Sequence, residues 1–174
     1  DSVWTLTRAR LPWLLIGLAG GMGGAYVIGA FDIEKNLEMA LFIPLIAAMG
    51  GNVGVQSAAI VVQGLASSNI GTSDILSRLY KELGVGMING LICGLLILGS
   101  SLVLGFGLSL SLTVSIALIC VIIFAALFGT FVPLVLNRYE IDPALATGPF
   151  ITTVNDIIGL MIYFAVGTVI VGFL

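Results

Sequence analysis

Asp156 is a carboxylate inside an otherwise uncharged stretch that runs from Pro143 to Leu174. A carboxylate at mid-membrane costs about 2.5–3.5 kcal/mol on insertion scales, and such residues usually face an interior cavity. All six basic residues lie at the ends of apolar stretches, so none can neutralise Asp156 at this depth. A neutral Asp hydrogen-bonded to a neighbouring helix is the structural alternative. The missing counter-charge favours a cation site.

Small and polar side chains surround Asp156 in the sequence. Thr152 precedes it by one helical turn, and Gly159 and Tyr163 continue the same helical stripe, so this face is expected to be polar or small. Asn155 adds an amide beside the carboxylate. We therefore take Thr152, Asn155 and Asp156 as candidate metal ligands.

A second candidate ligand set lies on an earlier apolar segment. Asn52 and Gln56 are four residues apart and share a helix face. Gly50 and Gly51 precede them and could expose backbone carbonyls, so this segment offers oxygen ligands without charge.

Several other polar residues have an ordinary structural explanation. Asp142 precedes Pro143, the usual order at the start of a helix, so we expect it to act as a cap; a place at the pore mouth is the alternative. Asn89, Ser57 and Gln63 are expected to form hydrogen bonds between helices.

Oxygen ligands with one carboxylate suit a hard cation. Mg²⁺ keeps several waters and is typically bound through one or two carboxylates. One Asp per chain is too little for dehydrated Ca²⁺, but two chains would bring two. A pore at a twofold interface is therefore more plausible than one inside a monomer.

The elements that must position these residues are membrane-spanning helices. The chain has 174 residues, of which 59% are hydrophobic and only 9% charged, against about 25% charged in soluble domains. Four uncharged stretches occur, and the longest, Leu83 to Asn137, must fold back, most plausibly at residues 105–109. The sequence thus predicts an all-α, polytopic membrane protein with five helices, near 11–31, 38–66, 82–104, 110–136 and 143–172.

The basic residues predict the orientation. Five crossings place every basic residue except Lys35 on the side of the N-terminus, together with the loops 67–81 and 137–142. The other side holds Lys35 beside Asp32, Glu34 and Glu38. By the positive-inside rule the N-terminus is cytoplasmic and the C-terminus is outside.

Glycines and prolines predict how the helices pack. Small residues recur at four-residue spacing around 17–24, 47–54 and 86–94, which is typical of close helix contacts in membranes. Pro44, Pro133 and Pro149 are expected to free backbone carbonyls at membrane depth.

Three separated motifs resemble one family. Phe42-Ile43-Pro44 and Gly50-Gly51-Asn52-Val53-Gly54-Val55-Gln56-Ser57-Ala58 are similar to the second-helix signature of MgtE-type magnesium channels and the related SLC41 carriers. Arg10-Leu11-Pro12-Trp13-Leu14 resembles the start of the first helix in that family, and the segment from Asp142 to Phe164 resembles the fifth. The resemblance covers essentially the whole chain.

The resemblance implies a homodimer of five-helix subunits in a bacterial inner membrane, with a central pore at the dimer interface. Asp156 would bind largely hydrated Mg²⁺ with backbone oxygens near Thr152, and the Asn52 segment would line the pore nearby. MgtE channels also carry a cytosolic N-domain and a CBS pair. This chain starts directly before its first helix, so residues 1–174 are expected to be the transmembrane domain alone, either excised or a natural short form.

Competing functions make different demands on the sequence. An SLC41-like exchanger is the alternative to a channel, and the Gly-Gly-Asn segment could be the broken helix that a carrier needs. A packing scaffold would leave Asp156 unexplained. An enzyme is not expected, because no nucleophile–base pair lies at depth, and the net charge of −3 argues against a nucleic-acid partner. The sequence leaves selectivity among Mg²⁺, Mn²⁺, Co²⁺ and Ca²⁺ open.

Overall fold

The protein is a bundle of long helices in a computed structural model, which describes residues 2–31, 33, 37–67, 75–146 and 148–171. Its elements follow in the order α1 (Val3–Ala30), α2 (Leu37–Ala40), α3 (Ile43–Ala66), α4 (Ile75–Val103), α5 (Leu108–Arg138), the 3₁₀ turn η3 (Pro143–Ala146) and α6 (Pro149–Val171). Five spans, one of them Leu37–Ala66 as a unit, are long and apolar enough to cross a membrane. The predicted all-α class and the five crossings are confirmed.

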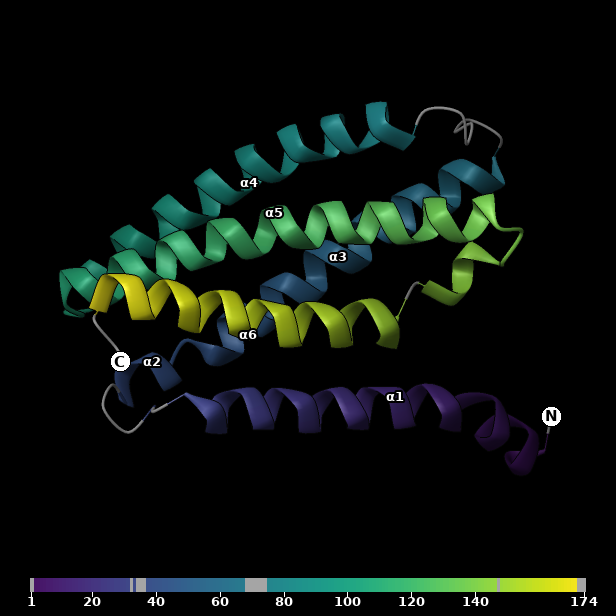
Figure 1. Cartoon of the computed structure of the whole chain (residues 1–174), viewed down its shortest axis with the longest axis horizontal. Coiled ribbons are helices and arrows are strands. Elements are labelled where there is room, and N and C mark those ends of the chain that lie inside the picture. Colours follow the sequence, from purple (N-terminus) through teal and green to yellow (C-terminus); the bar gives the residue numbers. More distant parts are fainter. Residues whose placement is uncertain (1, 32, 34–36, 68–74, 147, 172–174) are drawn as a thin grey trace.

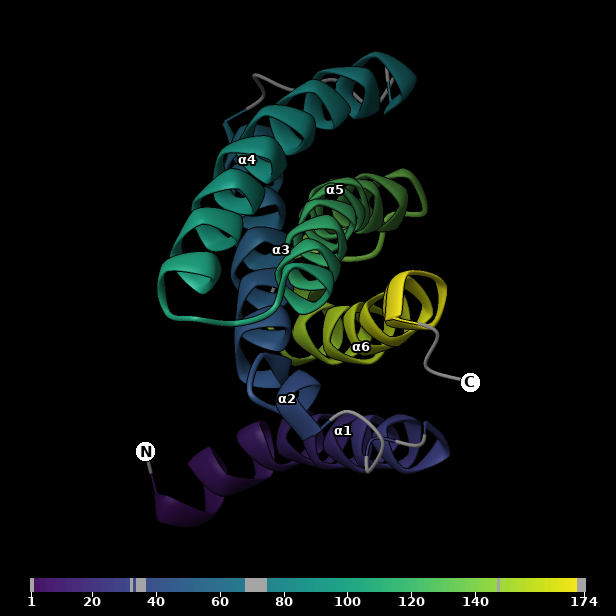
Figure 2. The same ribbon diagram turned by 90° about the vertical axis from the view of Figure 1, so that its left-hand side faces the viewer.

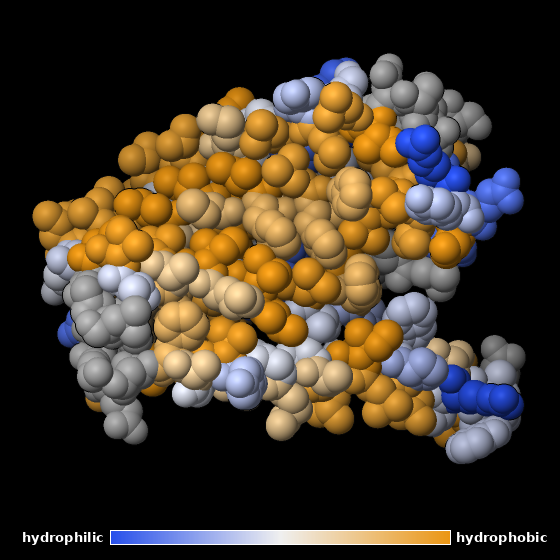
Figure 3. Space-filling view, in the orientation of Figure 1, coloured by the Kyte–Doolittle hydropathy of each residue, from blue (hydrophilic) through white to orange (hydrophobic). Residues whose placement is uncertain are grey.

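The central helix is α5, which lies between α4 and α6 with α3 crossing behind it (Figure 1). The view along the bundle shows α3 packed against α5 and α6, while α1 lies at the margin beside α6 (Figure 2). In the 18-residue apolar stretch by which each span was recognised, 61% of the residues of α5 are buried inside the subunit but only 11% of those of α1. The surface along the helices is largely hydrophobic, and hydrophilic residues gather toward the helix ends, most clearly where α1 begins (Figure 3).

The predicted boundaries are wrong at three helix starts. α1 begins at Val3 rather than residue 11, because Ser2 caps it by accepting from the Thr5 N–H at 3.3 Å. α4 begins at Ile75 rather than residue 82. α6 begins at Pro149 rather than residue 143, because Gly148 at φ +138° interrupts the helical path after η3.

Proline explains the break between α2 and α3. Pro44 lies in the first turn of α3, where it has no N–H to bond the carbonyl of Ala40. Pro149 likewise begins α6, so both prolines lie at helix starts and neither interrupts a helix from within. Pro133 does lie inside α5.

The predicted turn at 105–109 is confirmed at its first residues. Gly105 has φ +89°, which L side chains rarely adopt, and α5 starts at Leu108. The acidic and basic residues 32 and 34–35, which entered the orientation prediction, lie outside the described residues, as do residue 172 and the segment 68–74.

Candidate cation site between α3 and α6

A cavity of about 440 Å³ lies between α3 and α6. Four of the five predicted metal ligands line it. The lining residues are Ala47, Ala48, Gly51, Asn52, Val55 and Gln56 from α3, with Thr152 and Asp156 from α6. Residues separated by about a hundred positions in the sequence thus form one site.

Gly51 determines how closely Asp156 approaches α3. A Cβ at Gly51 would lie 3.7 Å from Thr152 Cγ2 and 3.8 Å from Asp156 Oδ1, so the two α6 side chains lie directly over this glycine. Asn52 and Gln56 are exposed on the subunit surface, whereas Thr152 and Asp156 are half-buried. The cavity is therefore walled by the helices on one side and open on the other.

The donor set consists of oxygens. The Thr152 hydroxyl lies 3.2 Å from the carbonyls of both Gly148 and Pro149, which share its one hydrogen, so its lone pairs remain free to accept. Asn52 and Gln56 add amide oxygens, and Asp156 adds the charge. Among the described residues no group of three or more His, Cys, Asp or Glu side chains could hold a metal. This arrangement suits a hydrated hard cation rather than a dehydrated one.

Asn155 lies elsewhere, although it was predicted as a ligand. It is 1% exposed and packs against Gly50 and Gly54 of α3 rather than lining the cavity. Neither its amide nitrogen nor its amide oxygen has a hydrogen-bond partner within the described parts of the chain. Consecutive residues on a helix point about 100° apart, so Asn155 and Asp156 face different neighbours.

Two further expectations about the site change. The Gly50–Asn52 segment is helical within α3, so it is no helix break. Gly50 packs closely against Val121, whereas Gly51 lies at the cavity beneath Thr152 and Asp156. The expected polar or small face of α6 is not continuous. Thr152 and Asp156 line the cavity, whereas Tyr163 is fully buried and donates to the Met39 carbonyl at 2.9 Å. Tyr163 anchors α6 to α2 on the core side.

Residues outside the cavity have mostly structural contacts. Asp142 accepts from the Ala144 N–H at 2.9 Å, as expected of a cap. Ser57 donates to Glu82 of α4 at 2.7 Å, as expected of a bond between helices. Asn89 and Gln63 are exposed. The role of Glu82 as the partner of Ser57 was not predicted, because the helix that carries Glu82 was expected to begin only at residue 82.

Comparison with known proteins identifies the family. Residues 43–166 match the family model described as MgtE, divalent cation transporter. This chain belongs to the MgtE family. It is 34% identical over 161 residues to the magnesium transporter MgtE of Bacillus subtilis, covering 91% of this chain and 36% of that protein.

Two further MgtE relatives have the same level of similarity. The magnesium transporter MgtE of Thermus thermophilus is 34% identical over 163 residues, covering 92% of this chain and 36% of the relative. That of Enterococcus faecalis is 34% identical over 161 residues, with 91% and 36% covered. The chain thus spans about a third of the length of these MgtE proteins, and it is a multi-pass membrane protein of that family.

Proposed function

We propose that this chain transports Mg²⁺ across the membrane through a pore formed by two copies, with Asp156 as the ion-binding carboxylate. The observation that carries the proposal is the α3–α6 cavity, which unites Asp156 with Asn52, Gln56 and Thr152. The match to a divalent cation transporter family and the relatives that are named magnesium transporters support the same cargo.

The size of the cavity suits a hydrated ion. Water takes up about 30 Å³ per molecule, so six waters need roughly 180 Å³, and the cavity measures about 440 Å³. Mg²⁺ loses its water reluctantly, so amide and hydroxyl oxygens would contact the water shell while Asp156 supplies the attraction. A second copy across the open side would add a second carboxylate. Mn²⁺, Co²⁺ and Ca²⁺ are the competing ions to test at the same oxygens.

A channel is favoured over an SLC41-like exchanger by the continuity of the helices. Carriers bind substrate where helices are broken near mid-membrane. Here α3 continues through Gly51, Asn52 and Gln56, and α6 through Thr152 and Asp156, without interruption. Flux that saturates and depends on sodium would instead support the exchanger.

The deciding experiment is Mg²⁺ uptake into liposomes that contain the purified chain, comparing wild type with Asp156→Asn. Two unit charges about 4 Å apart interact by about 4 kcal/mol at an effective dielectric constant of about 20, and intervening water reduces this. We expect uptake to fall on the order of 100-fold. Glu140→Gln is the matched control, because it removes an exposed carboxylate outside the cavity.

The outcomes separate the hypotheses. Equal uptake by wild type and Asp156→Asn would show that Asp156 is structural. No uptake by a correctly folded wild type would favour a packing scaffold that carries no ion. A loss of uptake in Asp142→Asn would place Asp142 at the pore mouth rather than only at its cap.

The membrane and orientation belong to the same proposal. A cytoplasmic N-terminus is supported by Arg8 and Arg10 near the start of α1, Arg78 and Lys81 near the start of α4, and Arg138 at the end of α5. The bacterial relatives make a bacterial inner membrane the proposed location. A reporter enzyme that works only in the cytoplasm, fused before residue 1, should be active.

A further inference from the structure

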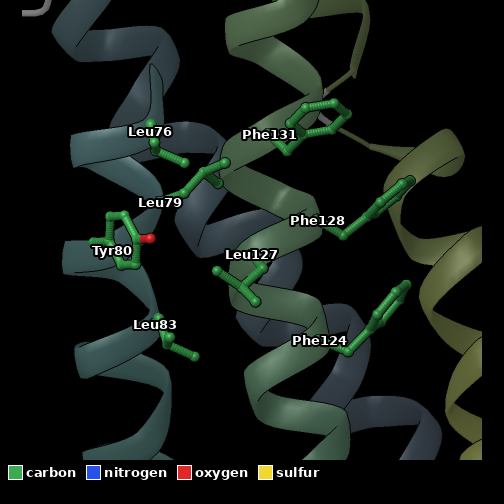
Figure 4. A pocket seen from close by; sticks show the side chains of 8 residues that line it. All are labelled: Leu76, Leu79, Tyr80, Leu83, Phe124, Leu127, Phe128 and Phe131. Carbon is green, nitrogen blue, oxygen red and sulfur yellow. The ribbon is translucent and has the colours of Figure 1, made fainter. Parts of the chain in front are cut away.

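A second cavity, of about 420 Å³, lies between α4 and α5, away from the cation site. It is lined by leucines and aromatic rings: Leu76, Leu79, Tyr80 and Leu83 from α4, and Phe124, Leu127, Phe128 and Phe131 from α5 (Figure 4). We call it the α4–α5 cleft. Its lining leaves little that water could bond, apart from the Tyr80 hydroxyl.

The cleft exists because, along α4, the close contact with α5 begins only at Gly86. From there on, Gly86, Gly90 and Gly94 pack against α5, with Cβ positions within 3.3 Å of Ile123 and Ile119 atoms. The preceding turns of α4 carry leucines and Tyr80 instead of small residues, and the two helices diverge toward this end (Figure 1). Large side chains on both helices then leave a gap that they do not fill.

The cleft opens to the outside of the bundle. Leu76 is 66% exposed, Tyr80 67% and Phe131 45%. Both helices that form it are long and apolar enough to cross a membrane, and the cleft lies toward the end of α4 that carries Arg78 and Lys81. Lipid would therefore border the cleft near the membrane surface. The stacked rings of Phe124 and Phe128, with centroids 5.6 Å apart, give it a rigid wall. Its shape and chemistry match a hydrocarbon chain.

A polar, cationic mouth adjoins the apolar cleft. A neighbouring hollow shares Leu76 and Tyr80 with it and is completed by Ser77 and Lys81. Lys81 is exposed there, and the adjacent Glu82 points away, accepting from Ser57 of α3. Arg138 follows Phe131 by seven residues, on the same face of α5 and about 10 Å further along. Lys81 and Arg138 thus place two cations toward this end of the cleft, with the exposed Glu140 two residues beyond Arg138.

We propose that the α4–α5 cleft is a binding site for an anionic phospholipid. One acyl chain lies between the leucines of α4 and the phenylalanines of α5, and the phosphate meets Lys81 and Ser77 at the mouth. Basic pockets between membrane helices on the cytoplasmic side bind anionic headgroups in this way. The apolar lining provides the affinity for a chain, and Lys81 provides the preference for an anionic headgroup.

The test is native mass spectrometry of the 174-residue chain in detergent, with added phosphatidylglycerol or phosphatidylcholine of identical acyl chains. Wild type should retain phosphatidylglycerol several-fold better. Lys81→Gln should weaken that retention about fivefold, the effect of roughly one basic residue near an anionic headgroup. Arg8→Gln is the matched control, because it removes an exposed cation of α1, a helix that does not line the cleft.

A second pair of variants tests the cleft itself. Leu127→Trp should fill the space and lower the retention of both lipids, whereas Leu95→Trp, on a lipid-exposed position of α4 outside the cleft, should not. Equal retention of the two lipids by wild type, or unchanged preference in Lys81→Gln, would overturn the proposal. So would a Leu127→Trp protein that keeps its lipid but changes its oligomeric mass, because a second copy would then cover the cleft. Lipid retention is measured without ion flux, so this result is independent of the proposed transport.

Discussion

The two faces of α3 use small residues for different purposes. On one face, Gly50 and Gly54 let α5 and α6 approach so closely that almost no space remains. On the other face, Ala47 and Gly51 leave room beneath Asp156, and the result is a cavity. Both sets have the four-residue spacing expected of close helix contacts. The spacing alone therefore does not distinguish a closed contact from an open site.

The face of α3 that carries Gly50 and Gly54 should lose more stability from an added methyl group than the face with the cavity. The largest loss is expected where α3 crosses α5. A Cβ at Gly129 would overlap the backbone carbonyl of Gly54, which cannot move aside as a side chain can. We expect Gly129→Ala to lower the free energy of unfolding by about 3 kcal/mol, near the top of the range for overpacking. Denaturant titration in mixed micelles measures this, and Gly99→Ala, which has open space around it, is the control.

Gly54→Ala should have the next largest effect, because its Cβ would overlap the side-chain amide of Asn155. A side chain can yield more readily than backbone, so we expect a loss of about 2 kcal/mol. A double-mutant cycle with Asn155→Ala sharpens the comparison: the combined loss should be clearly smaller than the sum of the two single losses. Additive losses would mean that the glycine and the amide do not compete for the same space.

Tyr163→Phe tests the anchor on the core side of α6. The substitution removes the hydrogen bond to the Met39 carbonyl and leaves that buried acceptor without this partner. A loss of about 1 kcal/mol is expected in the same titration. No change would indicate that ring packing alone holds α6 at this position.

Gly51→Ala should have the smallest effect on stability but a clear effect on transport. Its methyl group would be at ordinary contact distance from Thr152 and Asp156, so the fold should change by less than about 0.5 kcal/mol. The same methyl would occupy space beside the carboxylate, and we expect Mg²⁺ uptake into liposomes to fall several-fold. Gly17→Ala, on an open face of α1, should change neither quantity. A destabilised Gly51→Ala protein with normal uptake would remove the distinction between the two faces.

Some features were predictable because they depend on local composition or on spacing along one helix. The spans follow from uncharged apolar stretches, and a close helix contact at Gly86, Gly90 and Gly94 follows from their common face, although its partner α5 does not. Asn52 and Gln56 lie on one face for the same reason. Helix starts were less predictable, since Arg8 and Arg10 are charged and yet lie inside α1.

The sequence by itself determined that this chain crosses the membrane five times and that Asp156 lacks a basic partner at its depth, because charge and hydropathy are properties of single stretches. The tertiary structure alone decided which neighbours share a space. It brought Gly51 beneath Asp156, turned Asn155 into the packed interior and separated α4 from α5 in the turns that precede Gly86. The rotation of each helix about its axis decides such outcomes, and that rotation is fixed by packing against other helices rather than by the helix's own residues.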